Sequence, residues 1–147
     1  MLKIDVLRPS DTVGLIELEQ IRDFLYEQLG KYGDPKADIM KAINYALNKG
    51  ITPGGFVVVG REDDQIIGAV VVNRTGMDGY IPENILVYIA THQEIRGKGY
   101  GRKLMEAAIN AAEGGIALHV EPDNPAKILY EKLGFTNKYL EMRLTKS

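Results

Sequence analysis

Three glycines within six residues, Arg96–Gly101 (RGKGYG), limit what this chain can fold into more than any other stretch. Glycine lowers the stability of a helix or strand that contains it, so the stretch is expected to form a turn. The segment before it, Ile85–Thr91, predicts a strand, and a helix reaching about Glu113 is predicted after it. We therefore expect a strand, a glycine-rich turn and a helix in direct succession.

Such a turn has the properties of an anion site. The first amides of a helix lack an acceptor within the helix, and the helix dipole favours negative charge at that end. Glycines let a phosphate approach the backbone closely. Positive charge is added by Arg96, Lys98, Arg102 and Lys103. A pyrophosphate is the natural ligand, although a tight turn without any ligand stays open as an alternative.

Two nucleotide-binding patterns do not fit this stretch. A phosphate-loop NTPase requires GxxxxGK[ST], which is absent from the sequence. A dinucleotide fold requires GxGxxG in an early βαβ unit, whereas the spacing here is GxGxG and lies deep in the chain. A basic patch for nucleic acid has no interleaved aromatic residue besides Tyr100. These classes therefore rank below a pyrophosphate site.

Composition sets the remaining bounds. With 147 residues, 45% of them hydrophobic and 26% charged, the chain is expected to form one domain, residues 1–147. The absence of cysteine excludes disulfides, thiolate metal sites and a cysteine nucleophile, and it suits a reducing, cytoplasmic location. We expect no metal site. A net charge of −2 and the lack of a long apolar run argue against nucleic-acid and membrane partners.

Apolar periodicity predicts the order β-α-α-β-β-β-α-β-α-β, an α/β (α+β) domain with antiparallel pairing early and some parallel pairing late. The run from Ile66 to Val72 is nearly all apolar, which indicates burial on both faces. The predicted strands are 2–7, 56–59, 65–73, 85–91, 116–121 and 139–144, and the predicted helices are 13–29, one through Ile39, Ile43 and Leu47, one after the glycines, and 125–133.

A second motif indicates which kind of ligand the glycine-rich turn binds. Residues 124–135 read NPAKILYEKLGF, and together with Arg96-x-x-Gly99-x-Gly101 they resemble the GNAT superfamily of acyl-CoA-dependent N-acyltransferases. The second motif matches the family at Asn124, Ala126, Leu129, Tyr130, Gly134 and Phe135, with one residue instead of two between Asn and Ala. The resemblance implies a central mixed, mostly antiparallel twisted sheet of six to seven strands flanked by about four helices.

The resemblance also implies a site for acetyl-CoA. By this match the pyrophosphate is held by the turn residues Arg96, Gly97, Lys98, Gly99, Tyr100, Gly101 and Arg102. In the family a bulge splays the fourth strand from the fifth, and the pantetheine arm lies in the opening. The corresponding backbone contacts here fall on Ile89, Ala90 and Thr91, and Asn124 adds one contact besides its ordinary role as a helix cap.

The implied reaction is direct transfer of an acetyl group from acetyl-CoA to a primary amine of a small molecule or peptide. Tyr130 matches the family tyrosine near the thioester sulfur, where a protonated phenol serves as the acid. The general base stays open among Glu83, Tyr88, His92, His119, Glu121 and a water. Acidic residues on the first helices and on the 62–64 hairpin would suit a cationic amine, or are ordinary solvated charges.

Two other functions stay open as alternatives, and one assembly state is expected. A non-catalytic member of the family would bind acyl-CoA as a sensor, and Tyr130 argues mildly for the enzyme instead. A small nucleic-acid-binding domain would use the basic residues of the turn, against the acidic balance of the chain. A homodimer is the expected assembly.

Overall fold

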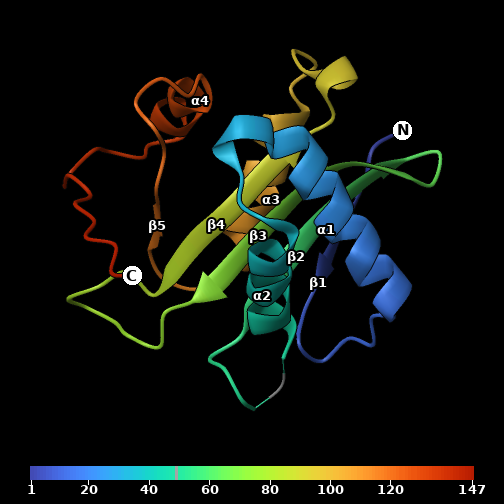
Figure 1. The fold of residues 1–147 in the computed structure, drawn as a ribbon. Helices are drawn as coiled ribbons and strands as arrows, with labels where there is room; N and C mark the ends of the chain where they lie inside the picture. The colour runs from blue at the N-terminus through green and yellow to red at the C-terminus, as the bar shows by residue number, and fades with distance from the viewer. Residues whose placement is uncertain (49) are drawn as a thin grey trace.

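The computed structural model describes residues 1–48 and 50–147. A five-stranded sheet in the order β1-β2-β3-β4-β5 has α1 and α2 on one face and α3 on the other (Figure 1). The elements are β1 (Lys3–Leu7), α1 (Leu15–Leu29), η1 (Gly30–Tyr32), α2 (Lys36–Leu47), β2 (Gly55–Glu62), β3 (Gln65–Arg74), β4 (Asn84–Thr91), η2 (Gln93–Ile95), α3 (Tyr100–Ala111), β5 (Ile116–Leu118) and α4 (Ala126–Lys132).

Neighbouring strands are antiparallel from β1 to β4, and β5 joins β4 in parallel. The predicted burial of the Ile66–Val72 run on both faces is confirmed in the middle of β3. Ala69 and Val71 pack under α1 and α2, whereas Val70 and Val72 pack under α3, and all four are fully buried. The alternating faces of one strand therefore anchor the two halves of the core.

The helices cover the sheet with the apolar residues that their periodicity predicts. Ile21 and Leu25 of α1 are fully buried at i, i+4 spacing. Ile39 and Ile43 of α2 follow the same rule. These helices precede the central strands in sequence (Figure 1). α1 lies across β3 and β4, whereas α2 lies across β2 and β3, so α1 forms the wall beside β4.

Close packing of α3 depends on a glycine in the strand beneath it. A Cβ added at Gly68 of β3 would lie 2.2 Å from Cδ1 of Leu104, a fully buried residue of α3. Heavy atoms of two side chains cannot approach so closely, so α3 can lie at this distance only over a residue without a side chain. The start of α3, and with it the glycine-rich turn, is thereby fixed against the sheet.

The sheet has five strands, so the predicted six to seven were wrong. The predicted strand 139–144 does not form, and the predicted strand 116–121 ends at Leu118. Alternation supplies an apolar side, but a strand also needs a hydrogen-bonded neighbour. The edge strand β5 has only three paired residues, and the C-terminal segment lies apart from it (Figure 1). The apolar side chains of that segment are exposed: Tyr139, Leu140, Met142 and Leu144.

Candidate active site

The glycine-rich turn connects β4, through the short helix η2, to the first turn of α3. Gly97 and Gly99 have φ of 92° and 80°, and Gly99 is the N-cap of α3 in the left-handed conformation. The first backbone bond of the helix runs from the Lys103 amide to the Gly99 carbonyl at 3.2 Å. The amides of residues 100–102 precede this bond and are the unpaired amides of the helix start.

The space over these glycines is open. Apart from the adjoining chain, no heavy atom of the described residues lies within 4 Å of a Cβ placed on Gly97 or on Gly99. Their conformation, and not crowding by neighbours, is what favours glycine at both positions. The arrangement presents several backbone amides, at the positive end of a helix, toward an open space that a phosphate can enter.

The charged side chains of the turn have different roles. The Arg96 guanidinium donates to the carbonyl oxygens of Gln28 at 3.2 Å and Thr91 at 3.4 Å, so it ties the turn to the ends of α1 and β4. The Tyr100 hydroxyl donates to Glu62 Oε2 at 2.8 Å, and this hydrogen bond raises the pKa of Tyr100. These contacts hold the turn in place, whereas Lys98 and Lys103 extend from it as exposed cations.

Beside the turn, β4 separates from β5. The two strands pair only where Asn84–Leu86 meets Ile116–Leu118, and from there to Thr91 the strand pairs with β3 alone. The β3–β4 register steps from Tyr88 directly to Leu86, which leaves Val87 as a β-bulge. A bulge bends its strand, and β4–β5 pairing ends at Leu86, immediately before it. On the side of β5, the backbone of Ile89–Thr91 has no paired strand among the described residues.

The two sequence motifs meet at one point. A Cβ placed on Gly101 would lie 3.6 Å from Cδ2 of Leu129 and 3.8 Å from Cγ2 of Thr91. The start of α3, the end of β4 and the helix α4 are therefore in contact. The two motifs, which lie far apart in sequence, are neighbours in the fold.

Tyr130 and Asn124 lie on the α4 side of this site. Tyr130 is 7% exposed, its ring lies 6.1 Å from the ring of Phe135, and burial raises its pKa to about 12. The N-cap of α4 is Pro125, and not Asn124 as predicted; Asn124 Oδ1 instead accepts the amide of Ala126 at 2.9 Å, a local bond just before the helix. Tyr130 is thus a phenol that stays protonated at neutral pH, and the Asn124 side chain has at least a structural task.

The candidate bases differ in what surrounds them. Glu83 accepts the amide of Gly115 at 2.7 Å, and this bond, with further backbone amides, lowers the pKa of Glu83. It lies at the far end of β4 from the turn and holds two loops together. His92 caps η2, with Nδ1 accepting the Glu94 amide at 3.1 Å. His119 is exposed, as is Glu121.

The surroundings of Tyr88, another candidate base, could not be predicted from the sequence. Its hydroxyl donates to Asp34 Oδ2 at 2.5 Å, across 54 residues of sequence. Burial and the neighbouring Asp34 carboxylate raise the pKa of Tyr88. The phenol is therefore held protonated and bonded, which disfavours it as a base. Asp34 lies just before α2, and the contact brings an acidic side chain to the α1–α2 side of β4.

Gln28 was missed altogether. Its Oε1 accepts the amide of Gln93 at 3.0 Å, and its carbonyl accepts Arg96, so α1 holds the entry to the glycine turn at two points. No local pattern marks Gln28, because it is an ordinary polar residue on a helix. Only its position in the folded chain shows its role.

The acidic hairpin that was considered for the acceptor site lies elsewhere. Asp63 and Asp64 form its turn with φ of 50° and 64°, as the predicted hairpin requires. Glu62 next to them bonds Tyr100 beside the glycine turn. The hairpin therefore lies at the end of the molecule that carries the glycine-rich turn, whereas Asp34 and Asp38, which were also considered for the acceptor site, lie just before α2 and in its first turn.

Residues 53–137 match the family described as the acetyltransferase (GNAT) domain, and the chain belongs to this family. N-alpha-acetyltransferase 30 of Schizosaccharomyces pombe is 33% identical over 85 residues, which cover 54% of this chain. The matched part spans only 57% of that protein.

Two solved structures share the whole fold. An aminoglycoside N-acetyltransferase in complex with CoA has a TM-score of 0.71 at 19% identity, covering 99% of this chain and 95% of the other. A GNAT family acetyltransferase of Streptococcus pneumoniae has a TM-score of 0.70 at 18% identity, covering 99% and 98%. These similarities confirm the predicted fold class.

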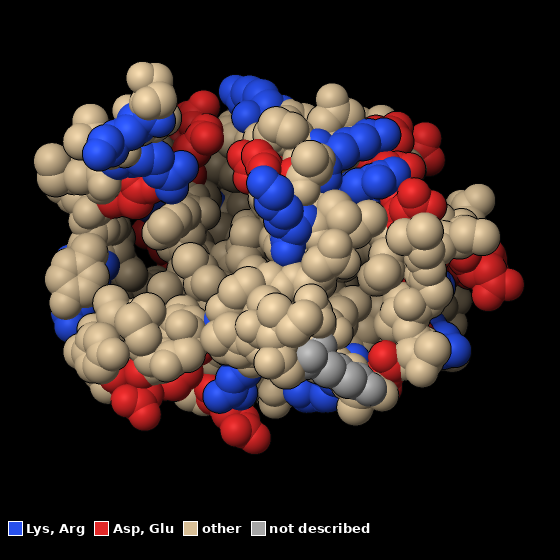
Figure 2. All heavy atoms as spheres, turned by 60° about the horizontal axis from the view of Figure 1, so that its bottom comes forward, with Lys and Arg blue, Asp and Glu red and all other residues tan. Residues whose placement is uncertain are grey.

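No helix among residues 1–48 and 50–147 is both long enough and apolar enough to cross a membrane. Within the same residues, no group of three His, Asp or Glu side chains is placed to hold a metal ion. On the face shown in Figure 2, the basic and acidic side chains are interspersed.

Proposed function

We propose that this protein is an N-acetyltransferase that moves an acetyl group from acetyl-CoA to a primary amine of a small molecule or peptide, by direct transfer in a ternary complex. One observation carries the proposal: the unpaired amides at the start of α3, residues 100–102, lie beside Thr91 at the end of β4, next to the gap in pairing between β4 and β5. The turn suits a pyrophosphate, and the gap suits an extended arm bonded to the backbone of residues 89–91. The family membership agrees with both.

The chemistry requires an uncharged amine, because an ammonium has no lone pair with which to attack. Its nitrogen forms a bond to the thioester carbonyl carbon, and the carbonyl oxygen becomes an oxyanion. A backbone amide near Ala90 or Thr91 is the proposed donor to this oxyanion. The C–S bond then breaks, the amine proton passes to a base or a water, and the thiolate sulfur accepts a proton.

Tyr130 is the proposed donor of that last proton. It is nearly buried between α3 and α4, beside the position where Gly101, Thr91 and Leu129 meet. Burial raises its pKa to about 12, so the proton is present at every physiological pH. A thiolate within reach of the phenol receives the proton as the bond to sulfur breaks.

The acceptor is proposed to bind on the α1–α2 side of β4. The acidic residues there, Asp34 and Asp38, favour a cationic amine by their charge. The Tyr88 hydroxyl fixes Asp34 near the middle of β4, next to the predicted oxyanion donors. Among the candidate bases, backbone amides disfavour proton uptake by the Glu83 carboxylate, and Tyr88 is held protonated by burial and its bond to Asp34. We therefore propose as the base a water or Nε2 of His92, whose Nδ1 accepts the Glu94 amide.

The test of this function begins with ligand binding. Thermal unfolding is followed with acetyl-CoA, CoA, NADH and a phosphate-buffer control. A ligand at about 100 times its Kd stabilises by about 2.7 kcal/mol, which for this size corresponds to roughly 5–11 °C in Tm. A rise of that order with both CoA forms and little with NADH supports the site. An unchanged Tm with saturating acetyl-CoA refutes it.

Acetyl transfer is then measured with a panel of amines that includes peptides, polyamines and an aminoglycoside. Tyr130→Phe should lower turnover at least about tenfold, because the proton for the leaving sulfur is lost. Its Kd for acetyl-CoA should stay within about twofold. Binding of CoA without transfer to any amine would instead favour an acyl-CoA-binding module, and unchanged turnover in the variant would exclude the role of Tyr130.

A further inference from the structure

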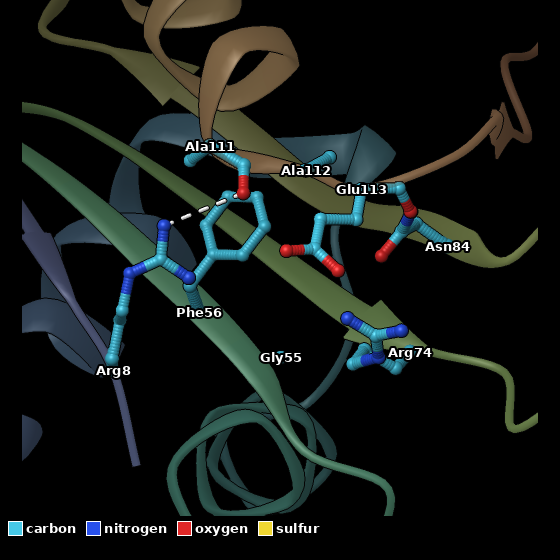
Figure 3. A pocket seen from close by; sticks show the side chains of 8 residues that line it. All are labelled: Arg8, Gly55, Phe56, Arg74, Asn84, Ala111, Ala112 and Glu113. Carbon is cyan, nitrogen blue, oxygen red and sulfur yellow. Dashed lines mark hydrogen bonds between the residues drawn. The ribbon is translucent and has the colours of Figure 1, made fainter. Parts of the chain in front are cut away.

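A second candidate site lies at the opposite end of β4 from the glycine turn. A cavity of about 150 Å³ opens where β3 ends and β4 begins, beneath the C-terminal end of α3 (Figure 3). Arg8, Arg74, Asn84 and Glu113 line it together with the ring of Phe56. Because β4 runs from Asn84 at this cavity to Thr91 at the turn, the two sites are separated by the whole strand.

One wall of the cavity is fixed in place. The Arg8 guanidinium donates to the carbonyl of Ala111 at 3.3 Å (Figure 3), and its Cζ lies 5.6 Å from the centre of the Phe56 ring. These contacts join the segment after β1 to the last turn of α3. They also hold one positive charge at the side of the cavity, with further N–H donors of Arg8 still free to bond.

Asn84 supplies a buried acceptor that has no donor. The residue is 1% exposed, and its Nδ2 donates to the carbonyls of Glu113 at 2.7 Å and Gly115 at 3.2 Å. These two acceptors fix which end of the amide is nitrogen. Its Oδ1 is buried and accepts no hydrogen bond from any described residue. Burial of an unsatisfied acceptor is unfavourable, so a molecule that donates a hydrogen bond to this oxygen would be favoured here.

The remaining charges of the cavity are not paired with each other. Neither Arg74 nor Glu113 forms an ion pair within 4.0 Å with another described residue. Figure 3 shows the Glu113 carboxylate between the guanidinium groups of Arg8 and Arg74. The cavity therefore offers guanidinium donors for an anionic group, and a carboxylate and an amide oxygen for a cationic group.

We propose that this cavity binds a small zwitterionic amino acid. Its ammonium donates to the Glu113 carboxylate and to Asn84 Oδ1, and its carboxylate accepts from Arg74 and Arg8. A simple anion would meet the two acceptors with no proton to offer, and a simple cation would meet two guanidinium groups. The volume exceeds the roughly 30 Å³ share of one water several-fold, yet lies below the range of about 300–1,000 Å³ of drug-sized ligands.

The test is calorimetric titration of the whole protein with glycine, glycinamide and acetate. Glycinamide keeps the ammonium and lacks the carboxylate, whereas acetate keeps the carboxylate and lacks the ammonium. Glycine should bind with a Kd at least about tenfold lower than that of glycinamide or acetate, because each of these ligands lacks one of the two charged contacts. A tenfold change in Kd corresponds to 1.4 kcal/mol. No heat with glycine, or equal affinity for glycine and acetate, overturns the proposal.

Two exposed positions give variants that keep the fold. Glu113→Gln should weaken glycine at least about tenfold and strengthen acetate, because a repelling carboxylate is gone. Arg74→Gln should weaken both ligands. Glu27→Gln and Arg143→Gln are the matched controls on exposed positions outside the cavity and should leave glycine binding unchanged.

Thermal unfolding of the same variants with CoA separates this proposal from the proposed acetyltransferase function. The CoA-induced rise in Tm should be the same in wild type, Glu113→Gln and Arg74→Gln, since the glycine turn is at the other end of β4. Glycine affinity that is unaffected by both substitutions would place its binding elsewhere and refute the site.

Discussion

A substitution in the glycine-rich turn is expected to lower both the stability of the protein and its affinity for CoA, and a control substitution separates the two effects. In Gly99→Ala, a methyl group enters open space above the turn, with no neighbour within 4 Å. The penalty to the free protein is thus one of backbone conformation alone. Gly50 provides the matched control, because it has φ of 78° against 80° for Gly99, its Cβ position is equally open, and it lies outside the predicted site.

The two substitutions should cost the same stability. An L-residue with a left-handed backbone costs about 1–2 kcal/mol relative to glycine, which for this chain length is roughly 2–8 °C in Tm. Only Gly99→Ala should also weaken CoA. The methyl group stands where a phosphate approaches the amides of the first turn of α3, and each hydrogen bond to a charged group contributes about 1.5–3 kcal/mol. Loss of one bond raises Kd at least about tenfold.

The assay combines thermal unfolding of the free proteins with calorimetric titration of CoA into each. We expect nearly equal Tm values for the two variants and a Kd at least about tenfold higher for Gly99→Ala alone. Equal CoA affinity in both variants would refute the assignment of the turn to the pyrophosphate. Weakened CoA in both would show that the loss follows from lower stability and not from the position of the methyl group.

Three further predictions concern stability. Burial raises the pKa of Tyr130 to about 12 from 10.0. The unfolded chain therefore loses this proton first, and the free energy of unfolding falls as the pH rises from 10 to 12. In urea unfolding, Tyr130→Phe should show a fall in this free energy that is smaller by up to about 2.7 kcal/mol than in wild type, and equal falls would contradict the burial. Tyr88→Phe removes the bond to Asp34 and should cost about 1.5 kcal/mol in urea unfolding, unlike Tyr26→Phe at an exposed ring. Gly68→Ala should lower stability by about 1–3 kcal/mol through its clash with Leu104, which differential scanning calorimetry against wild type would detect.

Most of the fold could be predicted from periodicity, because its elements are long and bury a regular face. The 3.6-residue repeat of Ile21 and Leu25, and the continuous apolar run of β3, each admit one arrangement against a core. The C-terminal strand was predicted by the same reasoning and is absent. Alternation describes one side of a segment, whereas strand formation depends on a partner that lies elsewhere in the chain.

The part of the candidate site that consists of contiguous backbone could be predicted from the sequence. The turn at Gly97 and Gly99 is a local feature, and its open amides follow from glycine positions that the sequence displays. Contacts between distant side chains were not predictable. Gln28 bonding the entry of the turn and Asp34 bonding Tyr88 each join segments more than 50 residues apart, and nothing in either segment marks its partner.

The bulge at Val87 links these observations. Leu86 and Tyr88 are two residues apart and would face the same side of a regular strand. In the structure Leu86 packs under α3, whereas Tyr88 packs toward α1 and α2, because Val87 is the extra residue between them. Pairing with β5 ends at Leu86, immediately before this point. One inserted residue therefore opens the gap proposed for the pantetheine arm on one side and directs Tyr88 toward Asp34 on the other, so the cofactor side and the acceptor side meet in the middle of β4.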